Sequence, residues 1–81
     1  MKIKVIFFAT LREYAGARTV EMEIPVNTSV TDLRKLVIDK YPQMRLSKNA
    51  IIASINREFA SDEQIIPPDA EIALFPPVSG G

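Results

Sequence analysis

Residues 30–41 carry the strongest periodic signal in the sequence. Apolar side chains recur there at steps of three and four, the spacing of one face of an α-helix; they are Val30, Leu33, Leu36, Val37 and Tyr41. Ser29 stands at the N-cap position, and Asp32 places a negative charge near the positive end of the helix. Pro42 is expected to end it. One helix with one apolar stripe needs another surface to pack on, so the rest of the chain must supply that surface.

The other periodic stretches alternate with a period of two, which is typical of strands with one buried face. We expect strands at residues 2–8, 18–24, 50–55 and 71–75, the first two forming an antiparallel pair. The side chains expected to face inward are Ile3, Val5, Phe7, Val20, Met22, Ile24, Ile72 and Leu74. Those expected to face outward are Lys2, Lys4, Ile6, Phe8, Thr19, Glu21, Glu23, Glu71, Ala73 and Phe75.

The segments between these elements are short and rich in polar or turn-forming residues. We expect a short helical stretch at 9–15 ended by Gly16, a tight turn at 56–58 before Phe59, one helical turn at 61–64, a return to the core at Ile65 and Ile66, and a turn at 67–69. One main helix on one face of a mixed sheet of four or five strands predicts an α+β roll.

Composition limits the functions that are open to the chain. Its 81 residues make one domain, and an apolar content of 47% supports a core. Ten basic residues balance ten acidic ones, so we expect no nucleic-acid partner. No apolar run is long enough for a membrane span and no signal-peptide pattern opens the chain, so we expect a cytoplasmic protein. Cysteine and histidine are absent, which removes the usual zinc ligands and the commonest general base. We therefore expect no bound metal or cofactor and no catalysis by this chain alone.

The last six residues form an unusual ending: Pro76, Pro77, Val78, Ser79, Gly80 and Gly81. Two consecutive prolines prevent the last strand from continuing and favour a stiff, polyproline-like exit. The remaining side chains are small, so an extended tail of roughly 18–20 Å is thin enough to enter a narrow channel in another protein. We divide the chain into a folded domain at 1–75 and a tail at 76–81. The alternative is that the tail is an ordinary frayed end without a role.

Two segments, residues 5–13 and residues 74–81, resemble the MoaD/ThiS sulfur-carrier family, and the order of elements between them agrees with its ubiquitin-like β-grasp fold. Within that family the chain looks most like the small subunits of molybdopterin synthase. Thiamine-pathway carriers share the Gly-Gly end but look less similar in the opening strand and in the Pro-Pro pair. The chain departs from the family at Asp69-Ala70, where Gly-Asp is frequent. Asp tolerates left-handed backbone, so we expect the turn to survive.

The resemblance implies that the first and last strands lie side by side and parallel at the centre of the sheet. Phe8 and Phe75 would then end neighbouring strands on the same outer face, beside the root of the tail, and Phe59 would join them from the adjacent turn. Exposed apolar clusters usually mark partner sites. The expected partner-binding residues are Phe8, Phe59, Phe75, Pro76, Pro77, Val78 and Ser79. Alternatively, residues 9–16 cover the aromatic rings.

The resemblance also implies a chemistry for the terminus. A carboxylate lacks a leaving group, and an adenylyltransferase of the ubiquitin-activating type, using ATP and magnesium, would join AMP to the carboxylate of Gly81. A sulfur donor would then convert this end into a thiocarboxylate. Gly80 would keep the end slender as it enters the large subunit of molybdopterin synthase, in a heterotetramer of two small and two large subunits. Sulfur would pass there to a pterin precursor of the molybdenum or tungsten cofactor.

Three alternatives stay open from the sequence. A ubiquitin-like modifier would transfer the activated Gly81 to lysines of other proteins, after the same activation step. A thiamine-pathway carrier would deliver its sulfur elsewhere. In a plain interaction domain the tail would be inert. On the helical stretch at 9–15, Arg12 and Glu13 are either partner contacts or solvated side chains.

Overall fold

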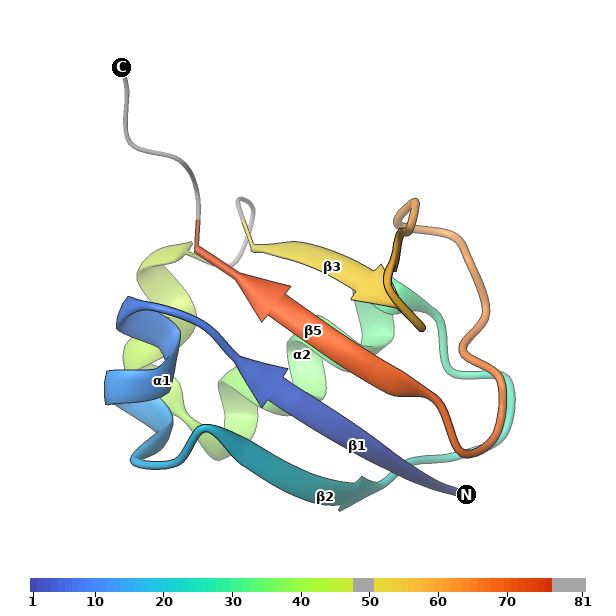
Figure 1. Ribbon diagram of the computed structural model, residues 1–81, viewed down its shortest axis with the longest axis horizontal. Helices are drawn as coiled ribbons and strands as arrows, with labels where there is room; N and C mark the ends of the chain where they lie inside the picture. Colours follow the sequence, from blue (N-terminus) through green and yellow to red (C-terminus); the bar gives the residue numbers. More distant parts are fainter. Residues whose placement is uncertain (48–50, 77–81) are drawn as a thin grey trace.

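The computed structural model describes residues 1–47 and 51–76 (Figure 1). In this part of the chain, five strands form one sheet in the order β2-β1-β5-β3-β4, with one main helix across it. This confirms the expected α+β class. The elements are β1 (Lys2–Phe7), α1 (Thr10–Ala15), β2 (Thr19–Glu23), α2 (Val30–Lys40), the 3₁₀ helix η1 (Pro42–Ser47), β3 (Ile52–Ile55), β4 (Glu58–Phe59) and β5 (Glu71–Phe75).

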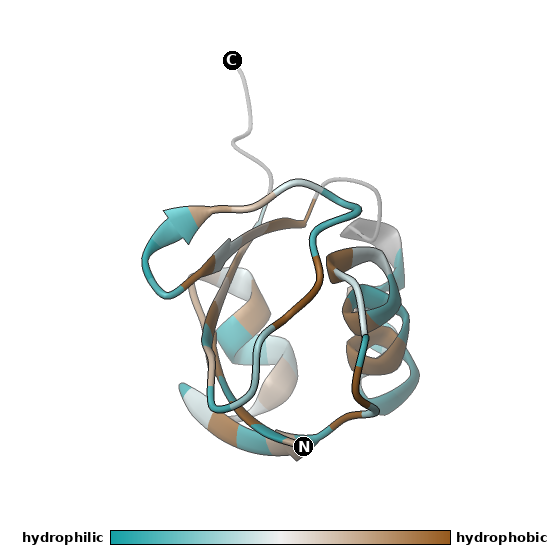
Figure 2. Cartoon of the chain, turned by 90° about the vertical axis from the view of Figure 1, so that its right-hand side faces the viewer, coloured by the Kyte–Doolittle hydropathy of each residue, from teal (hydrophilic) through white to brown (hydrophobic). Residues whose placement is uncertain are grey.

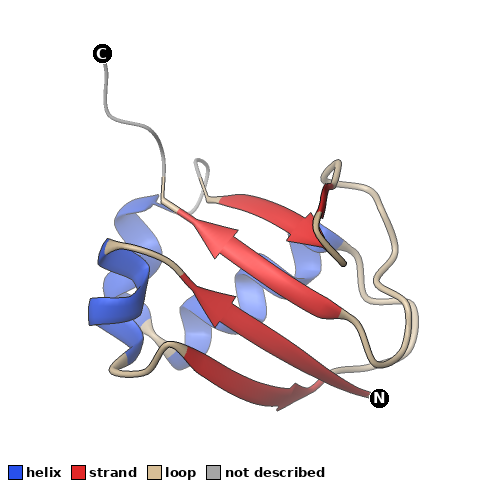
Figure 3. Ribbon diagram, viewed as in Figure 1, coloured by secondary structure: helices blue, strands red, loops and turns tan. Residues whose placement is uncertain are grey.

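The sheet is built around β5, which pairs with β1 in parallel and with β3 in antiparallel orientation. Val5 lies opposite Ile72, and Phe7 lies opposite Leu74. The hairpin of β1 and β2 is antiparallel, as predicted, and short β4 pairs antiparallel with β3. The parallel central pair inferred from the family resemblance is therefore confirmed, and it brings the C-terminal ends of β1 and β5 to the same edge of the sheet (Figure 3).

The core lies between the sheet and α2, which form two layers with hydrophobic segments on both (Figure 2). Every inward residue predicted on β1 and β5 is buried, and Phe7 meets the ring of Tyr41 edge-on with centroids 5.5 Å apart. On β2, Val20 and Met22 are only partly buried because β2 is an edge strand. The predicted helical stripe is also confirmed, with Leu36 at its partly buried margin.

The predicted caps of α2 and α1 are confirmed. The Ser29 hydroxyl accepts a hydrogen bond from the backbone N–H of Asp32 at 3.1 Å, which satisfies one of the unpaired donors of the first turn. Gly16 follows α1 in the left-handed region, with φ of 72°, and its N–H donates to the carbonyl of Arg12. As predicted, α2 ends before Pro42. The 3₁₀ helix η1 begins at Pro42, because proline is tolerated at the first position of a helix.

Two predictions for the segment after β4 are wrong. Ile65 is 50% exposed, and only Ile66 enters the core, because consecutive residues of extended backbone point to opposite sides. Residues 61–64 form a turn closed by a bond from the Gln64 N–H to the Ser61 carbonyl, not a helical turn. Four residues do not suffice to propagate a helix without packing support.

Smaller differences concern the ends of elements. Glu58 belongs to β4, so the tight turn after β3 consists of two residues. Phe8 lies one residue past β1, although its N–H still donates to the carbonyl of Leu74. The turn before β5 contains Asp69 with φ of 58°, as its tolerance of left-handed backbone predicted. Ala50, the first residue of the expected third strand, lies outside the described residues.

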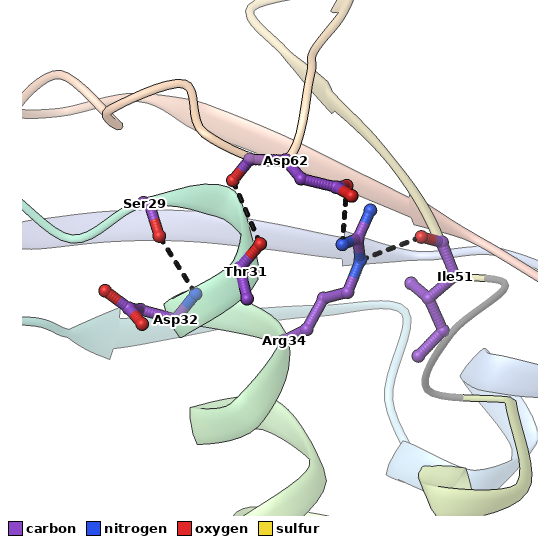
Figure 4. Close-up of polar contacts among 6 residues, drawn as sticks. All are labelled: Ser29, Thr31, Asp32, Arg34, Ile51 and Asp62. Carbon is purple, nitrogen blue, oxygen red and sulfur yellow. Dashed lines mark hydrogen bonds and ion pairs between the residues drawn. The ribbon is translucent and has the colours of Figure 1, made fainter.

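A polar clamp around Arg34 ties α2 to the far half of the sheet (Figure 4). The Arg34 Nε donates to the carbonyl of Ile51 at 2.9 Å, and its Nη1 lies 2.7 Å from Asp62 Oδ1. The Thr31 hydroxyl donates to the Asp62 carbonyl at 3.1 Å. The Arg34 side chain is 16% exposed, so these charge-assisted contacts are partly shielded from water. The clamp fixes where β3 begins, and the sequence analysis did not predict it.

Candidate docking site at the end of the sheet

The outer face of the sheet, which is turned to the viewer in Figure 1, has two ends of opposite character. We call Lys2, Lys4, Glu21 and Glu23 the charged end; these side chains alternate in sign across the antiparallel hairpin of β1 and β2. Lys2 Nζ lies 3.6 Å from Glu21 Oε2, with both side chains well exposed. Alternating charge of this kind is typical of a solvated sheet face.

The other end of the outer face is aromatic. We call Phe8, Phe59 and Phe75 the aromatic patch. Phe8 and Phe75 stack with centroids 4.6 Å apart and an angle of 13° between their planes, and Phe59 lies 6.4 Å from Phe75. Phe8 is 37% exposed and Phe59 is 81% exposed. The three residues that the sequence proposed as one docking cluster therefore meet in space and present apolar surface to solvent.

Topology explains why residues so far apart in sequence come together. Phe8 follows β1 and Phe75 ends β5, and these two strands are parallel neighbours. Phe59 ends β4 and lies opposite Ser54 of β3, which in turn lies opposite Ala73 of β5. Because β1 and β5 run in the same direction, their C-terminal ends lie side by side at one end of the sheet.

The aromatic rings border a shallow depression of about 310 Å³. Its lining combines apolar side chains with a few polar ones: Ile6, Phe8, Ser54, Arg57, Phe59, Glu71, Ala73 and Phe75. The alternative in which residues 9–16 cover the rings is not observed. Ala9, with φ of 53°, turns the chain at once after Phe8, and α1 instead buries Leu11 in the core. Arg12 and Glu13 are exposed on α1.

The hairpin turn between β3 and β4 holds Phe59 in position. Asn56 and Arg57 both have positive φ, 49° and 72°, as in the type I′ turns that suit two-residue hairpins. The Asn56 side-chain oxygen accepts from the N–H of Glu71 at 3.0 Å, and the Asn56 N–H donates to the Glu71 carbonyl at 2.8 Å. These two bonds fasten the turn to the central strand.

The aromatic patch adjoins the point where the tail begins. Phe75 is the last residue of β5, and Pro76, half-buried, follows it directly. The other predicted tail residues, namely Pro77, Val78, Ser79, Gly80 and Gly81, lie outside the described residues. Sequence reasoning missed Arg57 as a lining residue; the available signal was an arginine where a hairpin turn favours glycine. No helix of the described ranges 1–47 and 51–76 has the length and apolarity that crossing a membrane requires.

A central parallel strand pair, flanking antiparallel strands and one crossing helix define a ubiquitin-like β-grasp domain. The chain belongs to the ThiS family, whose model matches residues 5–81. A relative from Caenorhabditis briggsae, described as a molybdopterin synthase sulfur carrier subunit, is 30% identical over 83 residues, covering 100% of this chain and 99% of the relative.

Solved structures agree with the β-grasp fold. SAMP1 from Haloferax volcanii superposes with a TM-score of 0.82 and 28% identity, covering 100% of both chains. A chain from the complex of subunits 1 and 2 of the molybdopterin-converting factor of Helicobacter pylori gives a TM-score of 0.68 at 17% identity, again over 100% of both chains. At that identity the second likeness shows the fold alone.

Proposed function

We propose that this chain is the sulfur carrier subunit of molybdopterin synthase. The observation that carries the proposal is the aromatic patch at the root of a Gly-Gly tail, in a member of the ThiS family. Relatives aligned over almost their full length bear this function in their names. Residues 1–75 form the folded domain that partners recognise, and residues 76–81 form the tail that carries the reactive carboxylate. We place the protein in the cytoplasm.

The chemistry resides at Gly81. Its carboxylate attacks the α-phosphate of ATP, bound with magnesium by an adenylyltransferase, and pyrophosphate leaves. The terminal sulfur of a persulfide then attacks the acyl carbon of the mixed anhydride, and AMP departs. A thiol reduces the resulting acyl disulfide and releases the thiocarboxylate. This chain has neither cysteine nor histidine, so the thiols and general bases of these steps come from its partners.

The aromatic patch is the docking surface for the partners. A buried aromatic cluster at the centre of an interface, surrounded by a polar rim, is the usual arrangement of binding hot spots. Docking there directs Pro76 and Pro77 toward the active site of the large subunit, and Gly80 allows a narrow approach because it has no Cβ. Two small and two large subunits make up the assembly. The chain itself binds no metal or cofactor.

A second candidate function is protein modification. The neighbour from Haloferax volcanii is a small archaeal modifier protein and is 28% identical over the whole chain. A modifier uses the same activated Gly81, but the acyl group is transferred to a lysine amine instead of to sulfur. The two functions therefore differ in the fate of the terminus and not in its activation.

Intact-mass analysis of the protein from its native cells tests the proposal. We expect a fraction of the chain to carry one sulfur in place of one oxygen, assigned to Gly81 by fragmentation. A variant with one extra residue after Gly81 is expected to lack this form and to fail in cofactor assembly while keeping its fold. Cofactor assembly that survives the extra residue would overturn the proposal. Branched peptides that join Gly81 of this chain to lysines of other proteins, without thiocarboxylate, would favour the modifier.

A further inference from the structure

Arg57 stands on the rim of the depression beside the aromatic patch, at the tip of the β3–β4 turn. Its side chain is 89% exposed. Among the described residues its guanidinium makes one ion pair, between Nε and Glu71 Oε1 at 3.8 Å, which is long for a charge-assisted contact. An exposed pair of this length contributes little to stability. The side chain is therefore available to a partner without the loss of a strong internal contact.

The backbone at Arg57 makes this choice of residue unfavourable for the fold. With φ of 72°, Arg57 occupies the left-handed region, in the second position of a two-residue hairpin turn. Asn-Gly is the preferred sequence for such a turn, because glycine adopts positive φ without a clash between Cβ and the backbone. Asn56 matches the preference and Arg57 does not. Strained backbone of this kind is commonly found at functional sites.

The turn also presents Arg57 from a fixed base. The Asn56 N–H donates to the Glu71 carbonyl, and the Asn56 side-chain oxygen accepts from the Glu71 N–H. Two residues beyond Arg57, Phe59 contributes the most exposed ring of the aromatic patch. A positive charge thus lies at the margin of an apolar surface, which is the pattern of an interface with a charged rim.

We propose that Arg57 is a specificity-determining residue of the docking site: it pairs with a carboxylate on a partner protein whose apolar side chain covers the aromatic patch. The proposal rests on the proposed function and deepens it by naming the charge that the partner must present. Guanidinium groups bind carboxylates with two parallel N–H donors, and rim charges mainly raise the association rate. The competing view is that Arg57 is merely tolerated at an exposed turn.

Arg57→Gly separates the two views because the fold and the interface are expected to respond in opposite directions. Glycine relieves the turn, so the melting temperature should stay the same or rise. Association with the large subunit of molybdopterin synthase from the same organism should slow by roughly three- to tenfold at low salt, and its dependence on salt should flatten. Arg57→Lys keeps the charge and should recover most of the rate. Lys35→Ala, which removes an exposed charge from α2, is the matched control and should leave the rate unchanged.

Stopped-flow association measured at several salt concentrations, with melting curves for each variant, gives these readouts. An Arg57→Gly variant that binds as fast as the unsubstituted chain, with the same salt dependence, would overturn the inference and leave the proposed function standing. Equal slowing by Lys35→Ala would also overturn it, because the effect would then reflect net charge alone. If the unsubstituted chain does not bind the large subunit, the proposed function fails and the inference fails with it.

Discussion

The two ends of the outer sheet face share β1 and otherwise lie on different strands: the charged end on β1 and β2, the aromatic patch at the ends of β1, β4 and β5. Along β1 and the residue after it, the outward residues run from Lys2 and Lys4 through Ile6 to Phe8; on β5, they run from Glu71 through Ala73 to Phe75. At the charged end, the lysines of β1 lie opposite glutamates of β2, so these charges are balanced within the sheet. At the aromatic end, no part of the described chain covers the rings fully, and Phe8 and Phe59 remain exposed to solvent. We therefore expect a partner to cover the aromatic end of this face and to leave the charged end in solvent.

Three experiments test that contrast, and Phe59→Ala has the largest expected effect. Phe59 is so exposed that its loss should change the free energy of unfolding by less than ~1 kcal/mol. Binding to the large subunit should weaken by about 2 kcal/mol, roughly thirtyfold, if the ring is a hot spot. Isothermal titration with melting curves measures both quantities. Unchanged affinity would show that the aromatic patch is not the docking surface.

Arg34→Ala has the next largest effect and tests how the aromatic end is held in place. Loss of the two charge-assisted contacts to Ile51 and Asp62 should lower the free energy of unfolding by about 1.5 kcal/mol. Amide hydrogen exchange should rise most in β3 and β4, which the clamp anchors, and least in the hairpin of β1 and β2. Arg34→Lys retains the charge but loses the planar guanidinium, so its free energy of unfolding should lie between those of Arg34→Ala and the unsubstituted chain. Uniform loss of protection across all strands would contradict a local role of the clamp.

Lys4→Ala has the smallest expected effect and is the control at the charged end for Phe59→Ala at the aromatic end. Lys4 is exposed at the charged end, opposite Glu21 and Glu71. Its removal should change the free energy of unfolding by no more than about 0.5 kcal/mol and the affinity for the large subunit by less than about twofold. The same titrations and melting curves measure it. A loss of affinity comparable to that of Phe59→Ala would extend the interface across the whole outer face and remove the contrast.

Much of the fold was predictable because its signals are local. The stripe in α2, the alternation in β1 and β5, the Ser29 cap and the Gly16 stop depend on neighbours within a few residues. Where the chain lacks periodicity, the predictions were weaker: η1 was missed, and Ile65 was placed inside although it is exposed. Short irregular segments take their structure from what they pack against, and that information is not local.

The candidate site shows the same division. Alternation alone placed Phe8 and Phe75 on the outward faces of their strands, and the family resemblance made those strands neighbours. Arg57 escaped notice because its importance depends on a turn geometry and on a depression formed by four strands. No pattern within the β3–β4 hairpin indicates that Arg57 borders a patch to which two other segments contribute Phe8 and Phe75.

The sequence by itself determined which residues of β1, β5 and α2 face inward, where the main helix begins and where α1 ends. Those properties follow from periodicity, capping and backbone freedom, which act over one or two turns of chain. Only the tertiary structure decided that Arg34 anchors β3 and that Arg57 stands at the rim of the depression. Strand order and register bring these distant residues together, because hydrogen-bonded pairing acts in space irrespective of separation along the chain.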